Sequence, residues 1–159
     1  MFKIERHSGC YTLSAEQFLP ISLDHAWEFF SSPGNLKKIT PKHMGFQITS
    51  GDEGKMYPGQ IISYRVGILP MIKSNWVTEI THVTDKRFFV DEQRFGPYSM
   101  WHHEHHFEAV EGGVMMRDKV SYKVPFGPLG RLVHRFLIRS QLRNIFEFRF
   151  KILEDTFTK

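Results

Sequence analysis

The chain has 159 residues, 41% of them hydrophobic, and a formal net charge of +4. This length predicts a single domain over residues 1–159, because one hydrophobic core commonly serves a chain of this size. No apolar run approaches the length of a membrane-spanning helix, and the charged start of the chain lacks the apolar run of a signal peptide. We therefore expect a cytoplasmic protein without membrane insertion. Because Lys and Arg are interspersed with Asp and Glu along most of the chain, we also expect no nucleic-acid partner.

The first predicted elements are one strand and two short helices. Residues 11–20 alternate loosely between apolar and polar side chains and end at a proline, as a strand does. Ser22 is a suitable N-cap for an amphipathic helix. Its apolar positions recur at helical spacing: Leu23, Ala26, Trp27 and Phe30. A second helix is predicted to begin at Ser32–Pro33 and to stop before Pro41.

Six further strands follow, because apolar and polar residues alternate in six segments that Gly- and Pro-rich turns separate. The predicted segments are 46–49, 60–66, 72–83, 87–95, 99–110 and 114–124. Consecutive strands with short turns indicate an antiparallel meander. Together with the first strand they predict a sheet of about seven strands.

A helical period of 3.6 returns at about residue 129 and holds to about residue 157. One face carries a ridge of charged residues that we expect in solvent: Arg131, Arg135, Arg139, Arg143, Glu147, Lys151 and Asp155. The opposite face carries two apolar rows, namely Leu132, Phe136, Phe146, Phe150, Leu153 and Phe157, and Ile138, Leu142, Ile145 and Ile152. Such a helix is expected to lie across the concave face of a curved sheet, which gives an α+β fold.

Arg149 interrupts the second apolar row. A guanidinium that faces the sheet needs a partner, so we expect a carboxylate or backbone carbonyls beside it.

The densest polar signal lies in the strand at 99–110. Alternation places His103 and His105 on one face, with Trp101 and Phe107 on either side. Large aromatic neighbours indicate that this face points inward. Neighbouring strands contribute three further inward rows: Asp118, Val120, Tyr122 and Val124; Phe89, Asp91, Gln93 and Phe95; and Trp76, Thr78 and Ile80.

These inward polar groups have three interpretations. They form a satisfied structural hydrogen-bond network, they contact a ligand, or His103 and His105 bind a metal with Asp118 or Asp91. We expect no metal and no other cofactor, because no cysteine pair or HExxH spacing adds support. Cys10, the single cysteine, has no activating context for nucleophilic catalysis.

The combined motifs resemble those of a known superfamily. The residues that carry the resemblance are Trp27 to Leu36, Ile39 to Pro41, Asp91 to Gln93, Gly96 to Tyr98, Trp101 to Phe107, Asp118 to Pro125 and Ile145 to Arg149. Together with the order of elements they are similar to the SRPBCC superfamily, which includes START and Bet v 1-like proteins, and to its bacterial branch of uncharacterised ligand-binding proteins. Some relatives in that branch are labelled cell-division inhibitors.

The resemblance implies a helix-grip fold, in which a curved sheet wraps around a long C-terminal helix. It also implies a binding site for a small, largely apolar molecule, such as a lipid, a polyketide or an aromatic compound. We expect the site to include Trp76, Asp91, Gln93, Trp101, His103, His105, Phe107, Asp118, Tyr122, Phe146 and Phe150.

Two other functions stay open. One is a cyclase or aromatase that acts on a polyketide-like substrate, with a histidine as general base that Asp118 orients. The other is a regulatory module that binds a protein. We favour binding over catalysis, and the oligomeric state is not predicted.

Overall fold

The computed structural model describes residues 2–69 and 72–158. Its strands are β1 (Phe2–His7), β2 (Cys10–Leu19), β3 (Gln47–Ser50), β4 (Ile61–Leu69), β5 (Ile72–Thr84), β6 (Phe88–Phe95), β7 (Met100–Val110) and β8 (Gly113–Lys123). Its helices are α1 (Leu23–Phe30), the 3-10 turns η1 (Pro33–Lys37) and η2 (Lys42–Met44), α2 (Gly127–Val133), the π-helical turn η3 (His134–Ile138) and α3 (Arg139–Phe157).

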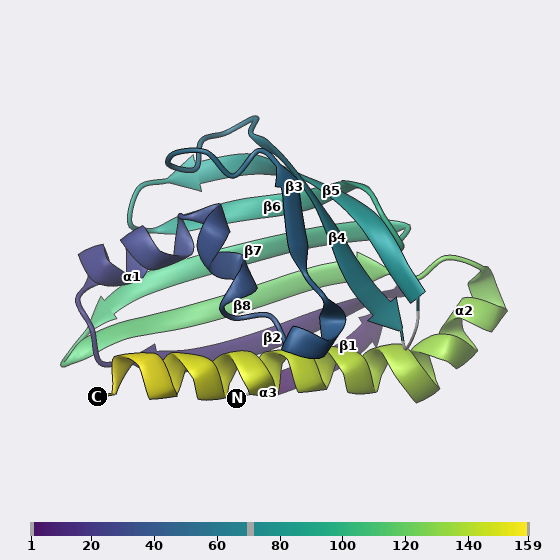
Figure 1. The fold of residues 1–159 in the computed structure, drawn as a ribbon. Helices are drawn as coiled ribbons and strands as arrows, with labels where there is room; N and C mark the ends of the chain where they lie inside the picture. Colours follow the sequence, from purple (N-terminus) through teal and green to yellow (C-terminus); the bar gives the residue numbers. More distant parts are fainter. Residues whose placement is uncertain (1, 70–71, 159) are drawn as a thin grey trace.

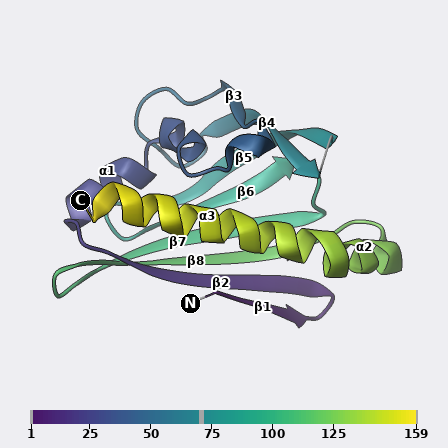
Figure 2. The ribbon, with the colours of Figure 1, turned by 60° about the horizontal axis from the view of Figure 1, so that its bottom comes forward.

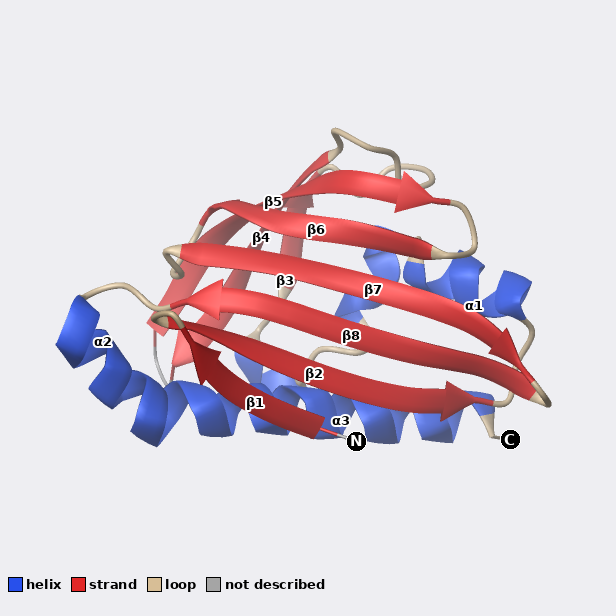
Figure 3. Ribbon diagram, turned by 180° about the vertical axis from the view of Figure 1, so that it is seen from behind, coloured by secondary structure: helices blue, strands red, loops and turns tan. Residues whose placement is uncertain are grey.

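The strands form one antiparallel sheet in the order β1-β2-β8-β7-β6-β5-β4-β3. The sheet curves over α3, which lies across its concave side (Figures 1 and 2). Figure 3 shows the opposite face of the sheet, with the helices behind it. The predicted α+β architecture, a curved antiparallel sheet around a long C-terminal helix, is confirmed.

The core lies between the concave side of the sheet and the helices. Trp27 and Phe30 of α1 pack with Phe107 of β7 and with Leu153 of α3 in one buried cluster. The first helix forms here because Ser22 caps it, with the Ser22 hydroxyl accepting a hydrogen bond from the backbone N–H of His25 at 3.2 Å. Among the described residues, no helix is both long and apolar enough to cross a lipid bilayer.

The sheet has one strand more than predicted, because residues 2–7 pair with β2. The connecting turn uses Ser8 and Gly9, which both have positive φ angles of 48° and 80°. Two central residues with positive φ suit the right-handed twist of a two-residue hairpin. The Ser-Gly pair between two alternating segments is therefore the signal in the sequence that points to β1.

Two predictions about side-chain direction are wrong. Phe95 is exposed rather than on the inner face, because β6 holds one extra residue between Gln93 and Phe95 in its pairing with β5. Such a bulge reverses the alternation beyond it. Leu132 and Phe136, predicted on an inner row, are also exposed. The π-helical turn η3 holds more residues than an α turn, so the side chains before it are rotated relative to those of α3.

The second predicted helix is present only as the 3-10 turn η1, and η2 follows it after Pro41. The charged ridge of the long helix is exposed along its whole length, as predicted.

Candidate functional site

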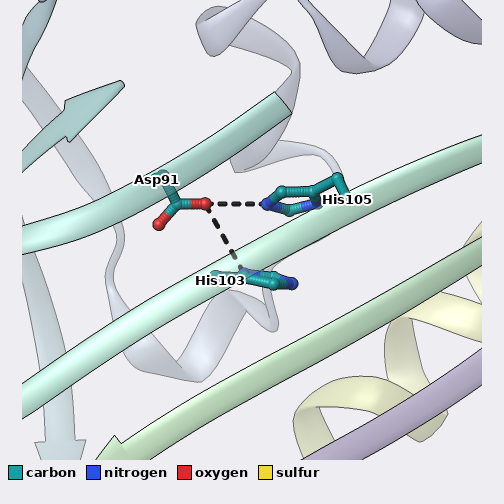
Figure 4. A group of neighbouring side chains, drawn as sticks. All are labelled: Asp91, His103 and His105. Atoms are coloured by element: carbon teal, nitrogen blue, oxygen red, sulfur yellow. Dashed lines mark hydrogen bonds and ion pairs between the residues drawn. The ribbon is translucent and has the colours of Figure 1, made fainter. Parts of the chain in front are cut away.

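Five ionisable side chains meet between the sheet and α3. They are Asp91 of β6, His103 and His105 of β7, Asp118 of β8 and Arg149 of α3. Strand register brings the first four together, because Asp91 pairs directly with His103 and Asp118 pairs directly with His105. Directly opposed residues share a face of the sheet. We call these five residues the polar cluster, and Figure 4 shows three of them converging.

Asp118 is the main acceptor of the polar cluster. Its Oδ1 lies 2.8 Å from Nε2 of His103 and 3.4 Å from Nη1 of Arg149, and both nitrogens donate to it. Nδ1 of His105 lies 3.1 Å from the same oxygen. Three positive or donating groups therefore surround one carboxylate oxygen.

Asp91 holds the other side of His105. Its Oδ2 accepts a hydrogen bond from Nε2 of His105 at 2.7 Å and lies 3.6 Å from Nδ1 of His103. The two imidazole rings lie close together at a tilt of 33°, with 3.7 Å between their centroids. His105 also stacks on Phe89, at 4.1 Å between ring centroids, which fixes the plane of its ring.

Burial and charge set the protonation of the polar cluster. Burial raises the pKa of Asp118, but the hydrogen bond from His103, the close approach of His105 and the charge of Arg149 outweigh burial and hold that pKa well below its usual range. The pKa of Asp91 is lowered too, since its contacts with His105 and His103 outweigh the same effect of burial. Both carboxyls are therefore ionised.

The two histidines differ. Burial lowers the pKa of His105, but the nearby carboxylates of Asp118 and Asp91, the second of which accepts its hydrogen bond, outweigh burial, and the net shift is upward. Burial, followed by repulsion from His105, lowers the pKa of His103. The upward shift favours the protonated form of His105, which with Arg149 balances the two carboxylates, and the downward shift favours the neutral form of His103. Such a balanced set is the condition under which charges persist in an interior.

Hydrogen bonding in the polar cluster is incomplete. Among the described residues, Nε of Arg149 is buried without a hydrogen-bond partner, and Nδ1 of His105 makes no hydrogen bond of good geometry despite its closeness to Asp118. A buried donor without an acceptor costs about 1–3 kcal/mol, so it is an uncommon feature of a core.

Two cavities adjoin the polar cluster, one of about 80 Å³ and one of about 150 Å³. Asp91, His105 and Arg149 line both, as do Leu36 and Tyr64. The larger cavity lies toward Trp76, Trp101, Phe146 and Ile145, and the smaller toward Phe30, Ile39, Ile62 and Ile80. The polar cluster thus forms a polar wall between two apolar spaces.

Three of these residues have the spacing of a metal site. Asp91, His103 and His105 each present one ligand atom, and the three atoms lie within 4.8 Å of one another. A divalent cation would have to displace the proton of His105 and would add charge beside Arg149, in a cluster whose charges already balance. The geometry permits a metal, but the electrostatics favour the proton.

The sequence-predicted site residues separate into two groups. Six of them line the larger cavity: Trp76, Asp91, Trp101, His103, His105 and Phe146. Asp118 does not line it but accepts the hydrogen bond of His103. Phe107 packs instead in the core cluster of α1, and the hydroxyl of Tyr122 hydrogen-bonds His134 at 2.8 Å. Phe150 is half-buried beside Phe146.

The side chain of Gln93 forms two hydrogen bonds with the backbone of Tyr98. Its Nε2 donates to the carbonyl of Tyr98 at 2.6 Å, and its Oε1 accepts from the N–H of Tyr98 at 3.1 Å. Gln93 therefore positions Tyr98, which lines the larger cavity.

Several lining residues are absent from the set that the sequence predicts. The expectation that Arg149 faces the sheet and finds a carboxylate is confirmed, and its position in an apolar row is the signal that could have placed it in the site. Tyr64 and Tyr98 also line the larger cavity; Tyr98 belongs to the Gly96 to Tyr98 motif, whereas Tyr64 has no distinctive pattern in the sequence. His134 lines neither cavity but is also buried, with its ring stacked on Tyr11 at 3.6 Å between centroids. Helical periodicity does not predict this inward position, because a π-helical turn begins there.

No family model and no curated protein matches this chain. Solved structures do match it over nearly its full length. Protein TTHA0849 from Thermus thermophilus has a TM-score of 0.69 at 15% identity, over 91% of this chain and 94% of that one. Protein Ms6760 from Mycobacterium smegmatis has a TM-score of 0.67 at 16% identity, over 97% and 98%. Ara h 8.0201 has a TM-score of 0.61 at 17% identity, over 92% and 99%. At such identities the likeness is one of fold.

Proposed function

We propose that the protein binds a small, largely apolar molecule, of lipid-, polyketide- or aromatic-like chemistry, between the sheet and α3. One observation carries the proposal. The Nε–H of Arg149 is a buried donor without an acceptor among the described residues, and Arg149 lines both inner cavities. A ligand oxygen that accepts this hydrogen bond would satisfy it.

The remaining walls suit an apolar body. Trp76 donates its indole N–H to the hydroxyl of Thr78 at 3.0 Å, so its polar group is already satisfied. Trp76 and Trp101 pack edge to face, with 5.3 Å between centroids, beside Phe146. Apolar walls with a few fixed polar groups are typical of small-molecule sites.

Cavity size limits the ligand. A cavity of about 150 Å³ holds a benzene-sized molecule. A ligand that also reached the cavity of about 80 Å³ would carry a second fused ring or a short chain past Arg149 and His105.

The test compares two probes of the same shape. The ketone 2-tetralone carries one acceptor oxygen, and tetralin carries none. Isothermal titration calorimetry should show tighter binding of 2-tetralone to the wild-type protein, by roughly 5- to 100-fold for one hydrogen bond to a buried donor. The preference for the ketone should disappear in Arg149→Met.

Arg143→Met is the matched control, because Arg143 is exposed on the same helix. It should keep the preference for the ketone. Equal affinity of the wild-type protein for both probes, or an unchanged preference in Arg149→Met, would overturn the proposal.

The neutral state of His103 favours a second candidate function. Nε2 of His103 donates to Asp118 at 2.8 Å, which leaves the lone pair of Nδ1, 3.6 Å from Oδ2 of Asp91, without a hydrogen bond, and His103 lines the larger cavity. A neutral imidazole that a carboxylate orients is the arrangement of a general base. Nδ1 would remove a proton from the carbon beside a ligand carbonyl, and Arg149 would stabilise the enolate oxygen.

This second candidate has its own readout. In D₂O the protein should exchange the α-protons of 2-tetralone for deuterium, as followed by NMR. His103→Gln should abolish this exchange and leave the affinity for 2-tetralone nearly unchanged. If the wild-type protein causes no exchange above the buffer rate, the binding function stands alone.

A further inference from the structure

Large apolar side chains are exposed at the start of the long C-terminal helix. They are Phe126, Leu129, Leu132, Phe136 and Leu137, and Ile72 at the start of β5 joins them. Phe126 is 78% exposed and Phe136 is 65% exposed. One surface groove is lined by Phe136, Leu137 and Ile72 together, so the two segments are neighbours. We call these six residues the end patch.

The end patch lies at one end of the molecule. In all three ribbon views α2 projects past the ends of the strands (Figures 1, 2 and 3). Single exposed apolar residues are ordinary on a protein surface, but several large apolar side chains that gather at one end of the molecule mark an interaction surface.

Positive charge borders the end patch. Residues 119–146 hold six Lys or Arg residues and no Asp or Glu, so this segment accounts for more than the formal net charge of +4. Arg131, Arg135 and Arg139 are exposed along the helix. The guanidinium of Arg135 lies 5.8 Å from the ring centroid of Phe136, so cation and apolar surface are adjacent.

This combination identifies the chemistry of the partner. Exposed Phe and Leu side chains gain free energy by entering the boundary between lipid headgroups and acyl chains, and arginines beside them reach the lipid phosphates. An anionic bilayer surface adds roughly 1 kcal/mol for each nearby Lys or Arg. We propose that the end patch docks the protein on the surface of an anionic lipid bilayer, with α2 and η3 lying in the interface and no segment crossing it.

The surface groove beside the end patch adjoins the larger inner cavity. Met44, Gln141 and Ile145 line both the groove and that cavity. An apolar molecule that leaves the bilayer would meet this groove first. Docking itself depends only on exposure and charge, so its failure would leave the proposed ligand site unaffected.

Vesicle co-sedimentation of the full chain tests the proposal. The wild-type protein should pellet with vesicles of equal parts phosphatidylcholine and phosphatidylglycerol, and should stay in solution with phosphatidylcholine alone. Raising the salt from about 0.05 M to about 0.5 M should release much of the bound protein, because salt screens the attraction.

Two double variants separate the contributions. Arg135→Gln with Arg139→Gln should weaken binding to the anionic vesicles by roughly 25-fold, about fivefold for each arginine. Leu132→Ser with Phe136→Ser should weaken it by about tenfold or more, and this pair should alter folding little because both side chains are exposed. Circular dichroism of each variant checks that the fold is kept.

Matched controls lie outside the end patch. Lys55→Gln with Lys151→Gln removes two exposed charges elsewhere, and Phe18→Ser removes an exposed apolar ring at the end of β2. Both should bind the anionic vesicles as the wild type does.

Three results would overturn the proposal. The first is no pelleting with anionic vesicles. The second is equal loss of binding in the control variants. The third is a wild-type dimer in light scattering that Leu132→Ser with Phe136→Ser converts to a monomer without any effect on vesicle binding, since the end patch would then be an interface between two copies.

Discussion

Arg149 of α3 and Asp118 of β8 join the C-terminal helix to the sheet through a buried ion pair, with 3.4 Å between Nη1 and Oδ1. Asp118 also receives a hydrogen bond from His103 and the charge of His105. The two ends of the pair are therefore not equivalent: within residues 2–69 and 72–158, Arg149 forms an ion pair with one carboxylate oxygen, while Asp118 has three partners.

The first prediction follows from that asymmetry. Asp118→Asn should lower the free energy of unfolding by about 3–5 kcal/mol, because it leaves the charges of Arg149 and His105 buried without full compensation. Arg149→Met should cost less, since Asp118 keeps both histidines. Urea denaturation of the two variants measures the difference. Glu111→Gln, in an exposed turn, is the control and should cost almost nothing. A larger loss for Arg149→Met than for Asp118→Asn would contradict the assignment of Asp118 as the main acceptor.

Two phenylalanines of α3 should differ in their contribution to stability. Phe146 is buried beside His103 and Leu142, so Phe146→Ala should cost about 3–5 kcal/mol. Phe150 is only half-buried, so Phe150→Ala should cost clearly less. Denaturant midpoints of the two variants test this order. If the two costs were equal, the inner face of α3 would be rotated from the arrangement described.

His134 should make stability depend on pH. Burial, together with the charge of Arg139, lowers the pKa of His134 to about 4, against about 6.5 in an unfolded chain. The folded state then binds fewer protons than the unfolded state between these values. The contribution of His134 is therefore complete above about pH 6.5 and is lost as the pH falls toward 4, by at most about 3 kcal/mol.

His134→Gln isolates this effect, because glutamine can still accept the hydrogen bond of Tyr122 and does not titrate. The difference in unfolding free energy between the wild type and this variant should shrink by up to that amount from pH 7 to pH 4. A difference that stays constant over this range would show that His134 titrates normally.

Two arginines of the charged ridge should be dispensable for folding. Arg135 and Arg139 are exposed, and exposed charges contribute about 0–1 kcal/mol. Arg135→Gln with Arg139→Gln should leave the melting temperature nearly unchanged. A drop of many degrees would mean that these side chains stabilise the helix, and that weaker vesicle binding of the same variant could come from partial unfolding.

The fold followed closely from periodicity. Strand segments, the capped first helix and the long final helix have strong local patterns, and the inward direction of His103, His105 and Asp118 followed from alternation alone. Irregular backbone produced the errors. The bulge before Phe95 and the π-helical turn at His134–Ile138 each change the phase of the side chains, and neither has a reliable local signature in the residues themselves.

The candidate site was only partly predictable for a different reason. Alternation shows which residues face inward, but not which inward residues border empty space. Phe107 and Tyr122 face inward and are packed against other side chains, whereas Trp76 and Trp101 border a cavity. That distinction depends on how α3, η1 and η2 pack on the sheet, which involves residues far apart in the sequence.

The most direct measurement is the NMR signal of the Arg149 Nε–H group in a ¹H–¹⁵N spectrum, assigned by its absence in Arg149→Met. If a ligand oxygen completes the hydrogen bonding of Arg149, this signal should move in a saturable way on addition of 2-tetralone and should stay in place with tetralin. Saturable binding of 2-tetralone that leaves the Arg149 signal unmoved would contradict the account.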